Sequence, residues 1–196
     1  ARLTGTSSEF GVQYDSLADL VSFGMAPSLV MYHWALSTMK LDGTLLGKVG
    51  WAAAFLYDAC AALRLDRFNT KVGSLDKRWF IGLNSPSAAG MMMAFVWSMN
   101  EFGWNGQELR YFALALTVTC ALLMVSRFRY TSFKGSGQDK QREDKVPFRM
   151  AILVVGVLVA LFIDPPRVLL LMAATYAISG PAYWLWLKLK PKSKIA

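Results

Sequence analysis

The chain has 196 residues, of which 55% are hydrophobic and 17% charged, and its mean hydropathy is +0.34. This composition is too apolar for an ordinary soluble domain of this length and favours a membrane protein built as one domain, residues 1–196. The formal net charge of +8 could suggest a nucleic-acid-binding protein. However, the basic residues fall in blocks between apolar runs and form no recognisable nucleic-acid-binding motif, so membrane topology explains them better.

Six apolar segments, separated by charged residues, glycine and proline, predict an all-α, polytopic transmembrane bundle. The prediction uses the rule that about 20 apolar residues cross the hydrocarbon core as a helix. The segments are residues 10–37, 45–63, 85–100, 109–126, 150–163 and 168–187. Because the last segment contains Gly180 and Pro181, we expect that helix to kink there.

The distribution of lysine and arginine predicts the orientation of these segments, since cationic residues are retained on the cytoplasmic side. Seventeen of the twenty-one lie at alternate ends of the segments, in four places: Arg2 and the ranges 64–78, 127–149 and 188–194. Both ends of the chain are therefore expected to be cytoplasmic, and the first segment enters the membrane from that side.

Three residues at the start of the first segment are spaced by four: Gly11, Asp15 and Asp19. On a helix they lie along one face, and acids entering a membrane-length apolar helix are a functional-site hypothesis by default. Carboxylates one turn apart can hold Mg²⁺ or Mn²⁺, which also binds substrate phosphates, and glycine lets a ligand approach the backbone. The alternative is that the acids only favour the positive end of the helix dipole.

This pattern resembles the second half of the signature of CDP-alcohol phosphotransferases, D-x-x-D-G-x-x-A-R followed by G-x-x-x-D-x-x-x-D. Ala1 and Arg2 match the A-R step, and eight residues separate them from Gly11. Residues 62–69 (ALRLDRFN) and 82–89 (GLNSPSAA) are similar to A-L-R-L-A-R-F-N and G-L-P-S-P-A-A-A of the bacterial phosphatidylserine synthase subfamily. Asp66 and Asn84 depart from those patterns, and the resemblance covers residues 1–135.

The resemblance implies that Asp15 and Asp19 bind Mg²⁺ or Mn²⁺ and that Asp19 is also the general base. It implies a CDP site lined by Ala1, Arg2 and Gly11. The implied reaction transfers a phosphatidyl group from CDP-diacylglycerol to the hydroxyl of L-serine, giving phosphatidylserine and CMP. The implied enzyme is a homodimer in the bacterial inner membrane, with its site facing the cytoplasm.

The first half of the signature, with its own aspartates, does not precede Ala1 in this sequence. Those acids are the expected companions of Asp15 at the metal. We therefore expect this stretch of chain, taken alone, to lack a complete metal site and activity.

Four cationic residues follow the second segment: Arg64, Arg67, Lys77 and Arg78. Arginine supplies a planar fork of donors that suits a phosphate or the carboxylate of serine. Ordinary positive-inside anchoring is the alternative interpretation.

Asp58 is a further acid within an apolar segment. It could pair with a residue of a neighbouring helix or with Lys48, or it could be uncharged. His33, the only histidine, lies near the outer end of the first segment, and we expect it to have a structural role. Cys60 and Cys120 show no metal or redox spacing and are expected to be buried.

Two other functions stay open at the level of sequence. The same chemistry could use another acceptor alcohol: glycerol phosphate, inositol or choline. Alternatively, the chain could be a transporter or a helix-packing subunit in which the acids line a polar pathway.

Overall fold

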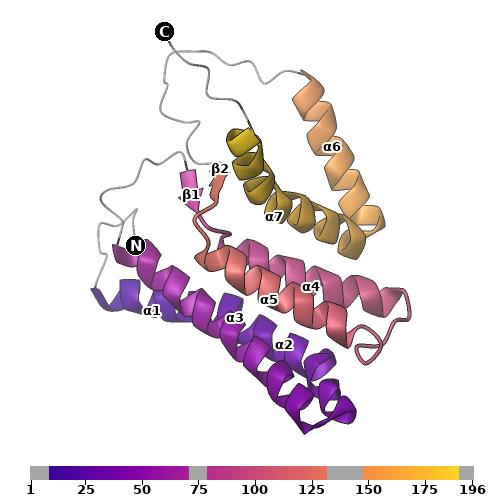
Figure 1. The fold of residues 1–196 in the computed structure, drawn as a ribbon. Coiled ribbons are helices and arrows are strands. Elements are labelled where there is room, and N and C mark those ends of the chain that lie inside the picture. The colour runs from indigo at the N-terminus through magenta and orange to yellow at the C-terminus, as the bar shows by residue number, and fades with distance from the viewer. Residues whose placement is uncertain (1–8, 71–78, 132–147, 190–196) are drawn as a thin grey trace.

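The structure is a computed structural model that describes residues 9–70, 79–131 and 148–189. These ranges are mostly helical (Figure 1). The α-helices are α1 (Glu9–Leu20), α2 (Ala26–Trp34), α3 (Thr44–Thr70), α4 (Ser85–Glu101), α5 (Arg110–Val125), α6 (Phe148–Ile163) and α7 (Pro165–Leu189).

The first apolar segment forms one continuous helix, because α1 runs through a π-helical turn, Val21–Met25, directly into α2. Pro27 explains part of this irregularity, since proline has no N–H to donate to the carbonyl one turn earlier. The carbonyl oxygen of Phe23 instead accepts a hydrogen bond of 3.1 Å from the hydroxyl of Tyr57 on α3. The π-helical turn is therefore held by the neighbouring helix. A short 3₁₀ helix, Leu36–Asp42, follows α2.

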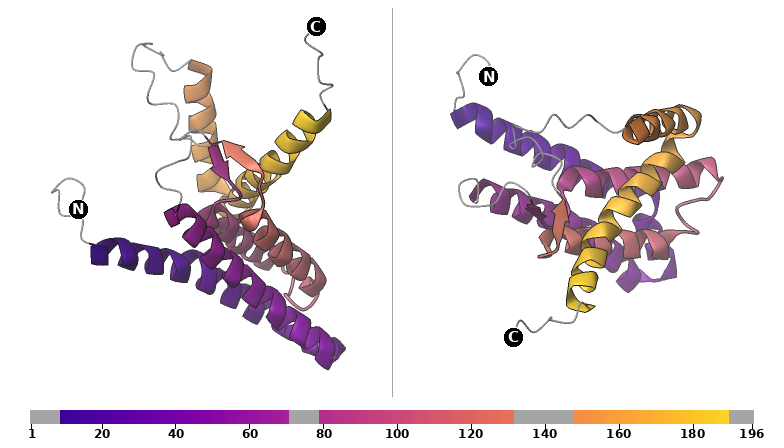
Figure 2. Two further views of the ribbon diagram at one scale, coloured as in Figure 1. Left: turned by 60° about the vertical axis from the view of Figure 1, so that its left-hand side comes forward. Right: turned by 90° about the horizontal axis from the view of Figure 1, so that it is seen from above.

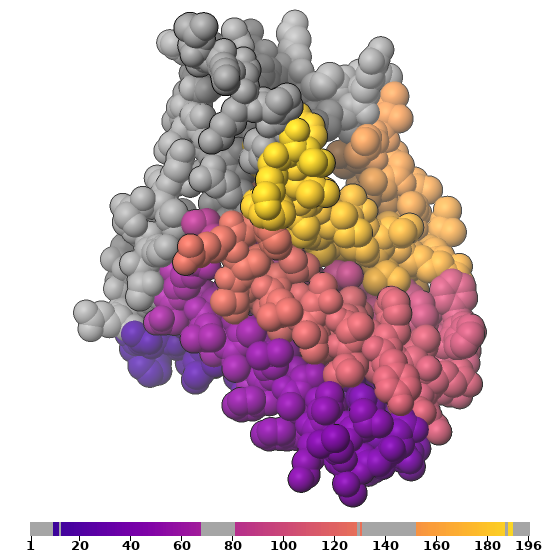
Figure 3. All heavy atoms as spheres, in the orientation of Figure 1, coloured from indigo at the N-terminus to yellow at the C-terminus, as the bar shows by residue number. Residues whose placement is uncertain are grey.

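The helices form three successive bands, which the space-filling view makes plain (Figure 3). The first band contains α2 and α3, the second α4 and α5, and the third α6 and α7. Helix α3 packs against α5, and α4 packs against α7. The fully buried side chains include those of Met31, Tyr57, Met92, Cys120 and Tyr130. Cys60 and Cys120 are buried and unpaired, as expected.

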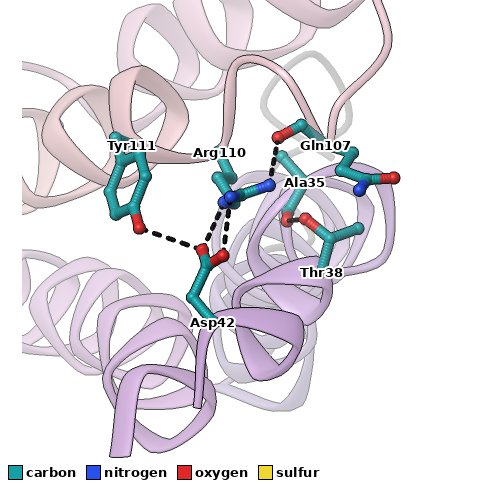
Figure 4. Close-up of polar contacts among 6 residues, drawn as sticks. All are labelled: Ala35, Thr38, Asp42, Gln107, Arg110 and Tyr111. Atoms are coloured by element: carbon teal, nitrogen blue, oxygen red, sulfur yellow. Dashed lines mark hydrogen bonds and ion pairs between the residues drawn. The ribbon is translucent and has the colours of Figure 1, made fainter.

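A polar cluster joins the 3₁₀ helix to the start of α5 (Figure 4). Arg110 donates to Asp42 Oδ1 over 2.7 Å, and the hydroxyl of Tyr111 donates to Asp42 Oδ2 over 2.9 Å. Arg110 also donates to the carbonyl oxygen of Gln107. This cluster ties together two turns at the end of the bundle opposite to Arg64.

The fold is mostly helical, as expected, and the described ranges also contain two short strands. Strand β1 (Trp79–Ile81) pairs antiparallel with β2 (Arg129–Thr131), and Phe80 lies opposite Tyr130. Gly82 allows the chain to leave β1 because its φ of 82° is a conformation that glycine adopts without steric cost. The N–H of Gly82 donates to the carbonyl oxygen of Phe128 over 2.8 Å, which continues the pairing by one residue.

The helix boundaries otherwise follow the six expected segments closely. Helix α3 is longer than expected, because the motif at residues 62–69 continues the helix to Thr70. Helix α7 contains Pro181 and changes direction along its length (Figure 1).

Within the described ranges, one helix is long and apolar enough to cross a membrane, Pro165–Trp186, judged by length and composition. Arg110–Val125 and Ile152–Ile163 are apolar but shorter. Six membrane spans with both ends in the cytoplasm therefore stay a prediction, as does the single-domain assignment.

Candidate active site

The two acids of the sequence motif lie on an exposed side of α1. Asp15 and Asp19 are both exposed, and Gly11 on the same face is exposed as well. Neither carboxylate makes a hydrogen bond or ion pair with another described residue. Both oxygens of each carboxylate are therefore available to a ligand.

The donor set of α1 fits a divalent cation that also binds a substrate phosphate. Mg²⁺ is commonly held by one or two carboxylates, with substrate oxygens and water completing its coordination. Asp15 and Asp19 supply two carboxylates one helical turn apart. Within the described ranges, no group of three or more acidic, histidine or cysteine side chains comes close enough to form a metal cluster.

Helices α1 and α3 are antiparallel, which brings the acids toward the expected anion-binding arginines. Phe23 contacts Tyr57, and a Cβ added to Gly24 would lie 3.2 Å from the Cβ of Ala61. The residues before Gly24 therefore run alongside those after Ala61. Figure 2 shows the free end of α1 and the C-terminal end of α3 extending to the same side of the molecule. Asp15 and Asp19 thus share one end of the bundle with Arg64 and Arg67.

Arg64 lies half-buried at this end of the bundle. Its Nη1 donates to the hydroxyl of Ser85, the first residue of α4, over 3.2 Å. Its Nε is buried and has no hydrogen-bond partner among the described residues. Burial lowers the pKa of the guanidinium, and the neighbouring Tyr176 opposes that shift. A buried donor without a partner is uncommon in proteins, so this Nε is a donor that a bound anion could use.

Arg67 lies one turn beyond Arg64, and its Nη1 donates to the carbonyl oxygen of Val125 over 3.4 Å. This contact joins the end of α3 to the end of α5, which supports a structural role for Arg67. The other expected site residues, Ala1, Arg2, Lys77 and Arg78, lie outside the described residues.

Asp58 and His33 lie apart from the acids of α1. Both line a cavity of about 220 Å³ between α2 and α3, whose walls are mostly apolar. One carboxylate oxygen of Asp58 is buried without a hydrogen-bond partner in the described part of the chain. This oxygen would lie only 2.8 Å from a Cβ added to Gly24. A larger residue at position 24 would therefore clash with the carboxylate of Asp58, and glycine avoids the clash. The ring of His33 makes an edge contact with Tyr32, and its structural role stays a prediction.

Two tyrosines in contact with each other, Tyr130 and Tyr176, were not singled out from the sequence. Tyr130 on β2 is buried, and its hydroxyl donates to the carbonyl oxygen of Ala177 on α7 over 3.0 Å. Burial, with a smaller effect of Tyr176, raises the pKa of Tyr130 to about 12. The hydroxyl therefore stays protonated and donates this bond at neutral pH. Tyr176, on α7, packs its ring against that of Tyr130, with ring centroids 5.4 Å apart. Tyr130 lies on a three-residue strand and Tyr176 in the middle of α7, so neither position carries a periodic signal in the sequence.

Comparison with known proteins identifies the family. The model of the CDP-alcohol phosphatidyltransferase family matches residues 1–122. The chain belongs to this family. The match contains the acids of α1, the whole of α3 and α4, and most of α5. It includes Arg64 and Ser85.

The similar CDP-alcohol phosphatidyltransferases come from distant organisms. A protein of Helicobacter pylori (strain ATCC 700392 / 26695), named CDP-diacylglycerol–serine O-phosphatidyltransferase, is 34% identical over 190 residues, which is 97% of this chain and 74% of that protein. The protein of the same name from Methanocaldococcus jannaschii is 31% identical over 181 residues, 92% of this chain and 73% of that one. The Bacillus subtilis protein of that name is 34% identical over 136 residues, 68% of this chain and 66% of its own length.

Proposed function

We propose that this CDP-alcohol phosphatidyltransferase transfers the phosphatidyl group of CDP-diacylglycerol to the hydroxyl of L-serine, giving phosphatidylserine and CMP. The observation that supports this proposal most is that Asp15 and Asp19, which have no partner among the described residues, lie at the same end of the bundle as the half-buried Arg64. The similar proteins are named as serine O-phosphatidyltransferases, which supports serine as the acceptor.

In the proposed reaction, the serine oxygen attacks the β-phosphorus of CDP-diacylglycerol. The bond from that phosphorus to the bridging oxygen breaks, and CMP leaves with the bond's electron pair. The proton of the serine hydroxyl passes to the carboxylate of Asp19. A serine hydroxyl is a poor nucleophile at neutral pH, so a positioned carboxylate that accepts its proton contributes to the rate.

Mg²⁺ or Mn²⁺, bound by Asp15 and Asp19, would neutralise negative charge on the diphosphate. Arg64 contributes by binding the anionic part of the acceptor, since a guanidinium holds a carboxylate through parallel N–H donors. Orienting the acceptor in this way converts a two-body encounter into a reaction within one complex.

We further propose that the six helical segments span the bacterial inner membrane, with both ends of the chain and the site in the cytoplasm, and that two copies form a homodimer. One substrate is a lipid and the other a soluble amino acid, so a site at the inner surface of the membrane can reach both. Helix α7, long and apolar enough to span, supports the membrane part of the proposal.

The test is CMP release by the purified full-length protein with CDP-diacylglycerol and one of four alcohols: L-serine, sn-glycerol 3-phosphate, inositol or choline. We expect release with L-serine only, and we expect EDTA to abolish it and Mg²⁺ or Mn²⁺ to restore it. Release with a different alcohol would show that this alcohol, and not L-serine, is the acceptor. If no alcohol supports release, the enzyme assignment is wrong and a transport or packing role is favoured.

A further inference from the structure

Ser85 is the first residue of α4, and its hydroxyl is the one hydrogen-bond partner that the Arg64 side chain has among the described residues. The Nη1 of Arg64, on α3, donates to the Ser85 oxygen over 3.2 Å. Both residues are partly buried, and Arg64 has no ion pair with another described residue. The orientation of the guanidinium therefore depends on this hydroxyl.

The start of α4 holds Ser85 firmly in place. Asn84, the residue before it, caps the helix by accepting from the N–H of Ser87 over 3.2 Å. Leu83 is fully buried, and its N–H donates to the carbonyl oxygen of Leu123 on α5 over 3.0 Å. Ser85 is thus mounted on a helix end that is tied to α5, whereas the arginine reaches it on a long side chain with many rotamers. The contact therefore constrains the arginine more than the serine.

The corner of the guanidinium that Ser85 occupies leaves a whole edge of the group without a described partner. In the planar guanidinium, Nη1 lies on the side of Cδ, while N–H bonds of Nε and Nη2 point along the opposite edge. The Nε of Arg64 is buried and has no hydrogen-bond partner in the part of the chain that the structure describes. No described residue accepts from Nη2 either. Two parallel N–H donors on one edge are the arrangement that binds a carboxylate through both its oxygens.

We infer that Ser85 is a positioning residue: its hydroxyl fixes the rotation of the Arg64 guanidinium, so that the edge formed by Nε and Nη2 is presented to the carboxylate of the amino-acid acceptor. This inference rests on the proposed function. An arginine that is already held in its binding orientation loses less freedom when the acceptor binds, which favours binding. Ser85 needs no contact with the substrate for this role, because it acts through Arg64.

The test compares Ser85→Ala with Ser87→Ala in steady-state CMP release by the full-length protein. Ser87 is a matched control because it is the same residue type in the same turn of α4 and its side chain makes no hydrogen bond to a described residue. We expect Ser85→Ala to raise the KM for L-serine by roughly threefold to tenfold, the effect of losing one hydrogen bond. The kcat and the KM for CDP-diacylglycerol should stay within about twofold of wild type, because the bond is not to the reacting atoms. Ser85→Thr keeps the hydroxyl and should restore the KM for L-serine.

A double variant shows whether Ser85 acts through Arg64. Residues that share one interaction have non-additive effects. We therefore expect the variant with both Arg64→Gln and Ser85→Ala to have a KM for L-serine within about twofold of that of Arg64→Gln alone. Additive effects of the two substitutions would show that Ser85 acts independently of Arg64 and would overturn the inference.

Three further results overturn it: an unchanged KM for L-serine in Ser85→Ala, an equal rise in Ser87→Ala, and a threonine variant that behaves like the alanine variant. If Ser85→Ala is not recovered folded, Ser85→Cys, whose thiol is a weak acceptor, is measured against the same expectations. A wild-type protein that releases no CMP with L-serine refutes the proposed function itself. That failure is distinct from one in which wild type is active and Ser85 has no effect on the KM for L-serine.

Discussion

Among single residues, Asp19 stands out because its carboxylate is exposed and makes no hydrogen bond or ion pair with another residue that the structure describes. A carboxylate held in an ion pair is less able to accept a proton than one that is free. Asp42, in contrast, is bound by both Arg110 and Tyr111. The contacts of Asp42 fit a structural role, whereas the exposed carboxylate of Asp19 is open to a ligand, as the proposed reaction requires.

We expect Asp19→Asn to lower the kcat for CMP release by about 10²-fold to 10⁴-fold, because an amide cannot accept the proton of the serine hydroxyl. Retention of CDP-diacylglycerol by the variant should be largely intact, as measured by binding of the radiolabelled lipid. Gln13→Ala changes an exposed residue on the other side of α1 and should leave turnover unchanged. Turnover that survives in Asp19→Asn would show that another group is the base.

Arg64→Gln should raise the KM for L-serine by roughly 10-fold to 100-fold, since the variant loses the charge that binds the acceptor carboxylate. The control is Lys48→Gln, which removes a positive charge near the opposite end of the same helix. Initial rates of CMP release over a range of serine concentrations measure both. Equal effects of the two substitutions would mean that Arg64 contributes only net charge.

At the scale of elements, the contact between β2 and α7 depends on a glycine. A Cβ at Gly180 would overlap the ring of Tyr130, and neither a buried ring nor a helix backbone moves aside without cost. The contact therefore joins two parts of the chain that are 50 residues apart in sequence, from Tyr130 to Gly180. This contact positions the second half of α7 against β2.

We expect Gly180→Ala to destabilise the protein by about 1–3 kcal/mol, the usual cost of adding a methyl group to a filled site. Gly156→Ala is the control, because a Cβ there meets nothing within 4 Å and alanine is the better helix former. Thermal unfolding in detergent should show a lower midpoint for Gly180→Ala and an equal or higher one for Gly156→Ala. Equal midpoints would contradict the tight packing of Tyr130 on α7.

Much of the element order could be predicted from the sequence, because apolar runs bounded by charge, glycine and proline define helices of this length. The π-helical turn could not, since it depends on Tyr57 bonding to the carbonyl of Phe23, a contact between distant residues. The β1–β2 pair was missed for the same reason, as three-residue strands carry no periodic signal. The acids of α1 and Arg64 could be proposed as site residues because they belong to motifs, and their roles stay predictions.

On the scale of the whole molecule, the charged residues separate to two ends. Arg64 and Arg67 lie at the end that contains β1 and β2, together with the acids of α1. The other end contains the cluster of Asp42 with Arg110 and the ion pair of Arg167 with Asp164. The guanidinium of Arg167 also lies over the ring of Phe102, 4.4 Å from its centroid. Arg110 and Arg167 are thus each paired with an acid, whereas Arg64 has no ion pair with another described residue.

This separation allows the proposed orientation to be tested with single cysteines. Cys60 and Cys120 are only 5% and 1% exposed, so a Cys60→Ala, Cys120→Ala background should keep the fold. Asn105→Cys and Arg127→Cys then place exposed thiols near opposite ends of α5. We expect a membrane-impermeant maleimide to label Asn105→Cys in intact cells, and Arg127→Cys only after permeabilisation, because the cationic end remains cytoplasmic. The reverse pattern would place the site outside the cytoplasm, and labelling of both thiols in intact cells would contradict a membrane-spanning α5.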